Sequence, residues 1–149
     1  MRNDTFMNKS KCEFSISSKT FSPDRITEEL NIQPNKTSKI GDIVTSKYSN
    51  SVGKKNYHSW SISSDCIFSD KEDITNQIKQ VQFLLRGKES TIVKYKSDVD
   101  TEIIFYIWIE TEDAGIGIDL SADQLSFISS ISTRLHFTII TNNEVLNKS

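Results

Sequence analysis

Four stretches of the chain carry the apolar spacing of β-strands. In three of them apolar and polar residues alternate, which is typical of strands with one buried face. Residues 101–111 are apolar on both faces, so they predict a central strand with both sides covered at least in part. The alternating stretches place these residues on one face of a strand: Cys12, Phe14 and Ile16; His58, Trp60 and Ile62; and Leu135, Phe137 and Ile139.

A motif that occurs twice predicts two capped helices. Residues 21–32 and 120–131 each begin with an apolar residue, a serine, a small residue or proline, and an aspartate. Ser22 and Ser121 are the predicted N-cap residues, and Gln124 completes a capping box with Ser121. Each motif is expected to join a strand to a helix, and the second follows a short predicted strand at 116–120.

A third helix is predicted between these two. We expect residues 69–72 to form a capping box at its start and Gly87 to follow its end. Residues 89–96 fit either a further helical turn or a short connection, and a short strand is expected near 42–47. The buried stripe of this helix consists of four aliphatic residues at helical spacing: Ile74, Ile78, Val81 and Leu85.

The order of these elements predicts the fold class. It favours an α+β two-layer sandwich with a mainly antiparallel sheet and helices on one face. The specific arrangement expected is ferredoxin-like with insertions. A length of 149 residues suits one domain, and no low-complexity linker divides the chain. We therefore predict a single domain over 1–149, with an ordered core at about 11–141 and polar tails.

The charge of the chain is nearly balanced but unevenly distributed. The net charge of -2 argues against a general nucleic-acid-binding protein. Residues 1–60 carry 10 Lys and Arg against 6 Asp and Glu, and residues 61–149 carry 8 against 14. No apolar run is long enough to span a membrane, and the first residues lack the apolar block of a signal peptide. A cytoplasmic protein is the simplest expectation.

Residue patterns that indicate catalysis or cofactor binding are missing from the sequence. The two cysteines and two histidines lie far apart and form no metal-binding motif. No GxSxG motif and no glycine-rich phosphate loop occurs. Cys12 and Cys66 fit either two reduced thiols or one disulfide. We predict no catalytic residue, no metal and no cofactor, and a non-enzymatic protein is favoured.

Two groups of residues remain as candidate sites. Carboxylates flank the central strand, where they suit a cation or a basic partner, or simply keep the strand ends soluble. This acidic group consists of Asp98, Asp100, Glu102, Glu110, Glu112 and Asp113. The second group is a candidate ligand pocket formed by Trp60, His58 and Asp42. For Trp60, as for Trp108, packing in the core is the alternative role.

The chain resembles a bacterial family of domains of unknown function, the family numbered 4279. The shared order is a strand, a Pro-Asp-x-Ile-Thr helix start, a Gly-Asp pair, a Trp-containing strand, a long helix, a strand with an aromatic residue, and a final helix and strand. Asn31 stands where the family commonly has Gly, and Asn also suits a left-handed helix end. The resemblance spans about 12–140 and implies no established activity. The matching residues are Phe21 to Thr27, Leu30, Pro34, Gly41-Asp42, Trp60, Trp108 and Leu120-Ser121.

Two functions from different classes fit these observations. The first is a non-catalytic protein-binding domain whose partner is another protein, a toxin or a complex subunit, contacted by the acidic residues near 98–113. An immunity protein that neutralises a toxin is one form of this hypothesis, by analogy with small bacterial families. Blocking another protein needs a complementary surface rather than chemistry, so the first function is favoured. The second is a small-ligand-binding or enzymatic domain with a pocket near Trp60 and His58.

Overall fold

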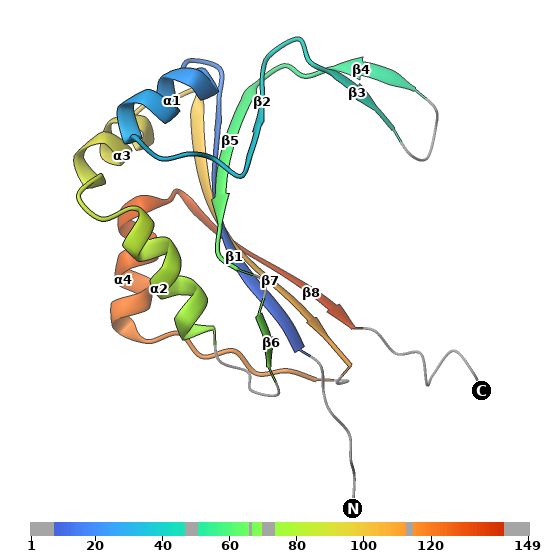
Figure 1. Cartoon of the computed structure of the whole chain (residues 1–149), viewed down its shortest axis with the longest axis vertical. Helices are drawn as coiled ribbons and strands as arrows, with labels where there is room; N and C mark the ends of the chain where they lie inside the picture. Colours follow the sequence, from blue (N-terminus) through green and yellow to red (C-terminus); the bar gives the residue numbers. More distant parts are fainter. Residues whose placement is uncertain (1–7, 47–50, 66, 70–73, 113–114, 142–149) are drawn as a thin grey trace, which may run out of the picture.

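The computed structural model describes residues 8–46, 51–65, 67–69, 74–112 and 115–141. It confirms the predicted α+β class, with a mainly antiparallel sheet and helices on one face (Figure 1). The elements are β1 (Asn8–Ser18), α1 (Pro23–Leu30), β2 (Lys36–Ser38), β3 (Ile43–Thr45), β4 (Val52–Lys54), β5 (His58–Ser63), β6 (Ile67–Ser69), α2 (Thr75–Leu84), α3 (Glu89–Lys96), β7 (Thr101–Thr111), α4 (Ala122–Ile131) and β8 (Arg134–Thr141).

The main sheet has the strand order β2-β5-β1-β7-β8, and β6 also pairs with β1. β1 runs antiparallel to β5 and to β7, so that Ile16 lies opposite both Trp60 and Ile103. β7 and β8 are parallel neighbours connected through α4. This connection differs from the expected ferredoxin-like arrangement, in which another strand separates the parallel strands of each split β-α-β unit. The hairpin of β3 and β4 projects from the main sheet in Figure 1.

One core lies between the sheet and the helices. Side chains alternate along each strand, so every strand turns one set of residues toward the helical layer. A fully buried Ile or Phe side chain contributes about 1.5–3 kcal/mol to folding, which makes this layer the main source of stability. The central strands bury Cys12, Phe14, Ile16, Ile103, Phe105 and Ile107, and the helices bury Ile26, Leu30, Ile78, Val81 and Ile92 against them.

The two capped helices form as predicted. The Ser22 hydroxyl accepts a hydrogen bond from the Arg25 N–H, and Asn31 ends α1 in the left-handed conformation with φ 54°. Ser121 and Gln124 make the reciprocal bonds of a capping box at α4. The predicted strand at 116–120 is wrong, because the structure gives these residues no strand. Its alternating Ile116, Ile118 and Leu120 instead rest partly buried against the core.

The third helix begins later than predicted. α2 starts at Thr75, its N-cap Ile74 makes no side-chain cap bond, and Ser69 belongs to β6, opposite Asn8. The expected capping box at 69–72 is therefore wrong for Ser69, while residues 70–72 lie outside the described residues. The buried stripe is confirmed, since all four of its aliphatic residues are at most 3% exposed. Residues 89–96 form a separate helix, α3.

Candidate functional site

The sheet has a second face that points away from the helices, and we call it the open face. Its residues follow from the alternation along each strand and from the strand register. In Figure 1 the described helices α1 to α4 lie on the other side of the sheet. The open face consists of Lys11, Glu13, Ser15 and Ser17 of β1; Ser59, Ser61 and Ser63 of β5; Glu102, Ile104, Tyr106, Trp108 and Glu110 of β7; and Arg134, His136, Thr138 and Ile140 of β8.

Two aromatic residues of β7 occupy the middle of the open face. Tyr106 lies opposite His136, with ring centroids 5.3 Å apart in an edge-to-face arrangement. Trp108 lies opposite Lys11, whose Nζ is 5.6 Å from the indole ring. Both aromatic side chains are only part-buried. Aromatic rings with polar tips suit protein interfaces, where one end contacts apolar groups and the other contacts water.

The Tyr106 hydroxyl is protonated in this environment. Burial raises the pKa of its hydroxyl above the ordinary value, and the nearby carboxylate of Glu13 raises it further. The hydroxyl therefore stays protonated at neutral pH. A binding partner would meet a neutral phenol rather than a phenolate.

On the open face, one ion pair lies near the start of β7 and another lies near its end. Near its start, Arg134 Nη1 is 3.0 Å from a carboxylate oxygen of Glu102. Near its end, Lys9 Nζ is 4.0 Å from Glu110. A strand rises about 3.3 Å per residue, so these carboxylates stand roughly 26 Å apart. The aromatic residues thus lie between two charged ends, which is the layout of an interface with an apolar centre and a polar rim.

A hollow of about 590 Å³ lies at the start of β7, on the open face. Tyr57 and Tyr106 are among the residues that line it, together with the carboxylate-bearing Asp100 and Glu102. Ser17 and Ile104 contribute a small and an apolar surface to its lining. Lys19 also lines the hollow, so an incoming lysine or arginine side chain would meet two carboxylates and two aromatic residues that attract it and one ammonium that repels it.

The structure distributes the predicted acidic residues over both ends of β7. Asp98 accepts hydrogen bonds from Thr101 and Thr20, which lower the pKa of its carboxyl group and hold the turn before β7. Asp100 and Glu102 share the hollow. Glu110 and the exposed Glu112 belong to the far end, and Asp113 lies outside the described residues. The five described residues therefore do not form one cluster.

The residues predicted to line a ligand pocket contact different parts of the structure. Trp60 is completely buried, and its indole N–H donates to Oγ1 of Thr27 on α1 at 2.9 Å. His58 Nδ1 accepts from the Ile40 N–H at 3.2 Å. Asp42 accepts from the Lys39 N–H at 2.7 Å and so holds the turn that leads into β3. A ligand would reach the Trp60 ring only if α1 moved.

The comparisons with known proteins agree with the resemblance seen in the sequence. The family described as Domain of unknown function (DUF4279) matches residues 8–142, from the first residue of β1 to the residue after β8. The chain belongs to this family. Among curated proteins and among solved structures, nothing matches the chain.

Most residues that connect this chain with the DUF4279 family have structural roles. Ser22 caps α1, Leu30 is buried, and Thr27 holds the Trp60 indole. Trp108 differs from these, because it lies part-buried on the open face. The sequence already placed Trp108 and Tyr106 on one face of this strand, but it did not show that Tyr57 and Ser17 meet Tyr106 around the hollow. The sequence signal for such neighbours is that alternate residues of a strand lie on the same face. This signal becomes informative once it is known which face the helices cover.

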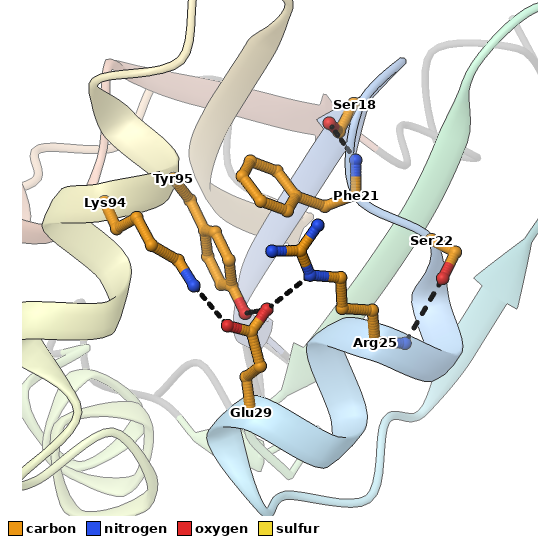
Figure 2. A network of polar contacts seen from close by, with 7 residues as sticks. All are labelled: Ser18, Phe21, Ser22, Arg25, Glu29, Lys94 and Tyr95. Carbon is orange, nitrogen blue, oxygen red and sulfur yellow. Dashed lines mark hydrogen bonds and ion pairs between the residues drawn. The ribbon is translucent and has the colours of Figure 1, made fainter.

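Figure 2 shows a polar cluster between α1 and α3 of this DUF4279 domain. The Glu29 carboxylate accepts hydrogen bonds from Arg25 Nε at 3.0 Å, from Tyr95 Oη at 3.2 Å, and from Lys94 Nζ. The hydrogen bond from Lys94 is the main reason why the pKa of Glu29 is lowered. Burial is the main reason why the pKa of Tyr95 is raised. A carboxylate with three donors is a weak base, so this cluster fastens α1 to α3 rather than supplying a catalytic base.

The remaining reactive groups do not form a chemical site in the described part of the chain. Cys12 is buried, and burial raises the pKa of its thiol to about 12, so the reactive thiolate is scarce at neutral pH. Cys66 lies outside the described residues. Within the ranges that the structure describes, no group of three His, Cys, Asp or Glu residues is placed to hold a metal ion. No helix there is long and apolar enough to cross a bilayer.

Proposed function

We propose that this domain is a non-catalytic protein-binding module and that it uses its open face. The observation that carries the proposal is the position of Tyr106 and Trp108. Large aromatic side chains are normally placed in a core, yet these two stand part-buried on a face that no described element covers. A partner protein that covers these two side chains would remove their apolar surface from water, as the helices do for the opposite face of β7, and this burial favours binding.

The hollow beside Tyr106 indicates which chemistry the partner presents. A lysine or arginine side chain inserted there meets Tyr57, Tyr106 and the carboxylate of Glu102. A cation–π contact contributes about 0.5–1 kcal/mol at an exposed site and about 2 kcal/mol when the cation is desolvated. Arg134 already pairs with Glu102, so the incoming cation shares this carboxylate and also meets Asp100. The proposed partner therefore carries a basic side chain at the edge of an apolar patch.

The finer form of this proposal is an immunity protein that neutralises a toxin in the bacterial cytoplasm. Such a protein works by covering a functional surface of its target, which requires shape and charge complementarity and no reaction. The hollow supports this form, because two tyrosines and two carboxylates in its lining could contact a basic residue of the target. The proposal involves neither nucleic acid nor a membrane.

A capture experiment with matched variants tests protein binding. The double variant Tyr106→Ala/Trp108→Ala removes the aromatic centre of the open face. Phe83→Ala/Leu84→Ala is the control, since it removes two exposed apolar side chains from α2 on the helical side. We expect the native host to yield a partner that binds the wild-type domain and the control but not the open-face variant. A partner that all three proteins retain, or no partner in repeated purifications, would contradict the proposal.

The charge of the hollow is tested with the captured partner. Glu102→Gln removes one carboxylate from the hollow, and Glu112→Gln removes an exposed carboxylate beyond the end of β7. We expect the first change to weaken binding about tenfold and the second to leave it within about twofold, because buried charge pairs contribute far more than exposed ones. Equal effects would show that the hollow is not the contact. Growth rescue on co-expression with the partner tests the immunity form.

A second candidate function is the binding of a small molecule in the same hollow. Its volume of about 590 Å³ lies within the range of small-ligand sites, which supports this alternative. A thermal-shift screen of metabolites separates it from protein binding. A ligand for this hollow stabilises the wild-type domain and fails to stabilise Tyr57→Ala. A ligand that stabilises both proteins equally binds elsewhere, and the region of His58 and Asp42 is then the next place to examine.

A further inference from the structure

The two edges of the main sheet are built differently. β2 forms one edge, has three residues, begins with Lys36, and follows Pro34 closely. Short length, lysine and proline are the devices by which natural proteins protect an edge from further pairing. β8 forms the other edge, has eight residues, and contains neither lysine, proline nor glycine. Among the described residues, β8 pairs along one side only, with β7.

β8 also exposes apolar side chains on both of its faces. Phe137 and Ile139 point to the helical side and are 40% and 46% exposed, and Ile140 on the open face is 43% exposed. A long, apolar and unprotected edge strand is the usual template for pairing with another strand. Water would otherwise have to solvate both these side chains and the outer backbone groups of β8.

We infer that β8 pairs antiparallel with β8 of a second copy of this chain. An antiparallel edge pair is related by a two-fold axis normal to the sheet, so residues that meet across it belong to the same face. When the axis passes through Phe137, the two Phe137 side chains meet. Leu135 then faces Ile139 of the partner subunit. All three helical-side residues of β8 between the strand ends are apolar and symmetric about this axis.

The charges of β8 agree with self-pairing. Arg134 is the charged residue of the strand and stands at its first position. In the register centred on Phe137 it lies opposite Ile140 of the partner subunit, and the two arginines are kept at opposite ends of the paired strands. On the same face His136 lies opposite Thr138 of the partner subunit. No like charges meet, which satisfies the main electrostatic condition for a cross-strand pair.

Self-pairing has a geometric consequence for the open face. The two-fold axis is normal to the sheet, so the open faces of both copies point to the same side of one continuous sheet. The dimer then presents two hollows to one partner surface. The inference does not depend on the proposed function, because it rests on the edge of the sheet and not on the aromatic residues of the open face.

Measurement of molar mass over a concentration series tests the inference. We expect sedimentation or light scattering to give a mass at high concentration that is twice the 17.0 kDa of the chain. Phe137→Lys places two like charges at the axis and should weaken the dimer at least tenfold. Phe83→Lys is the control, since Phe83 is 62% exposed on α2. A wild-type protein that is monomeric at all concentrations overturns the inference, as does a dimer that both variants preserve.

A cross-linking experiment tests the register and does not depend on a destabilising change. Phe137→Cys is prepared in a background with Cys66→Ser, and Thr138→Cys serves as the matched neighbour. Directly opposite residues of an antiparallel pair are close enough for a disulfide. We expect mild oxidation to link two copies through position 137 several times faster than through position 138. Equal rates at both positions, or no covalent dimer, would overturn the proposed register.

Discussion

The indole N–H of Trp60 donates a hydrogen bond to Oγ1 of Thr27, at 2.9 Å, and this bond ties β5 to α1. The Trp60 side chain is fully buried, so its donor has no access to water if the acceptor is lost. We predict that Thr27→Val lowers the free energy of unfolding by about 1–3 kcal/mol, the cost of a buried unpaired polar group. Urea denaturation measures the change. Thr37→Val, at an exposed position of β2, should change stability by less than about 0.5 kcal/mol.

The two tryptophans should respond differently to solvent. We predict that a Trp108→Phe variant, which retains the buried Trp60, shows blue-shifted emission and resists quenching by acrylamide. The Trp60→Phe variant, which retains the part-buried Trp108, should be quenched readily. Addition of a partner that covers the open face should protect Trp108 and leave Trp60 unchanged. Equal quenching of both variants would contradict the assignment of these residues to opposite faces.

The contribution of Glu29 to stability should depend on pH. Its pKa is lower in the folded protein than in the unfolded chain, where it is about 4.3. Glu29 therefore stabilises the fold above the unfolded pKa, and this contribution disappears as the pH falls through the lowered folded pKa. We predict that Glu29→Gln lowers stability by about 0.5–1 kcal/mol at pH 7 and has a smaller effect at low pH. Glu28→Gln, on the exposed side of α1, is the control, and a pH-independent loss would disprove the linkage.

Cys12 should be unreactive in the folded protein. Burial raises the pKa of its thiol to about 12, and the side chain is 0% exposed. In a Cys66→Ser background, we predict that iodoacetamide at pH 8 labels Cys12 only at the rate at which the protein unfolds. Guanidinium should make labelling rapid. Labelling of the native protein on the time scale of a model peptide would show that the core opens locally at β1.

The capping box of α4 should contribute measurably to stability. Ser121 Oγ accepts from the Gln124 N–H at 3.1 Å, and the Gln124 side chain accepts from the Ser121 N–H at 2.8 Å. We predict that Ser121→Ala destabilises the domain by about 1 kcal/mol. Ser126→Ala, at an exposed position inside α4, should be neutral or slightly stabilising, since alanine is the better helix former. Thermal unfolding of both variants provides the comparison.

Local chemistry was enough to predict the helices α1 and α4 and the central strand β7. Their caps and apolar spacing involve neighbours in sequence, so no knowledge of the rest of the fold was needed. The start of α2 could not be found in this way. The apparent capping residue Ser69 belongs to β6, where it pairs with Asn8 of β1. The alternation at Ile116, Ile118 and Leu120 likewise reflects packing on the core, and alternation alone does not show whether a backbone is paired.

The candidate site required information that is not local. β7 is apolar on both sides, so its sequence does not say whether Phe105 or Tyr106 faces the helices. Only the register with β1 and β8 settles this, and it brings Tyr106 to the side of His136. The same reasoning explains the separation of the predicted acidic residues. These residues lie near one another in sequence, but β7 is long, so those at its start and those at its end are far apart in the structure.

The position of β1 at the centre of the sheet also bears on how the domain is made. β1 is the first strand described, but its longest partner is β7, and the buried contact between Ser18 and Thr101 joins residues 83 positions apart. A ribosome releases the chain from its N-terminus, so Phe14 and Ile16 emerge long before the strand that completes their neighbourhood. During this interval β1 can pair with β5, but its side toward β7 stays without its strand partner. The contact between Ser18 and Thr101 can therefore form only after 83 further residues have been synthesised.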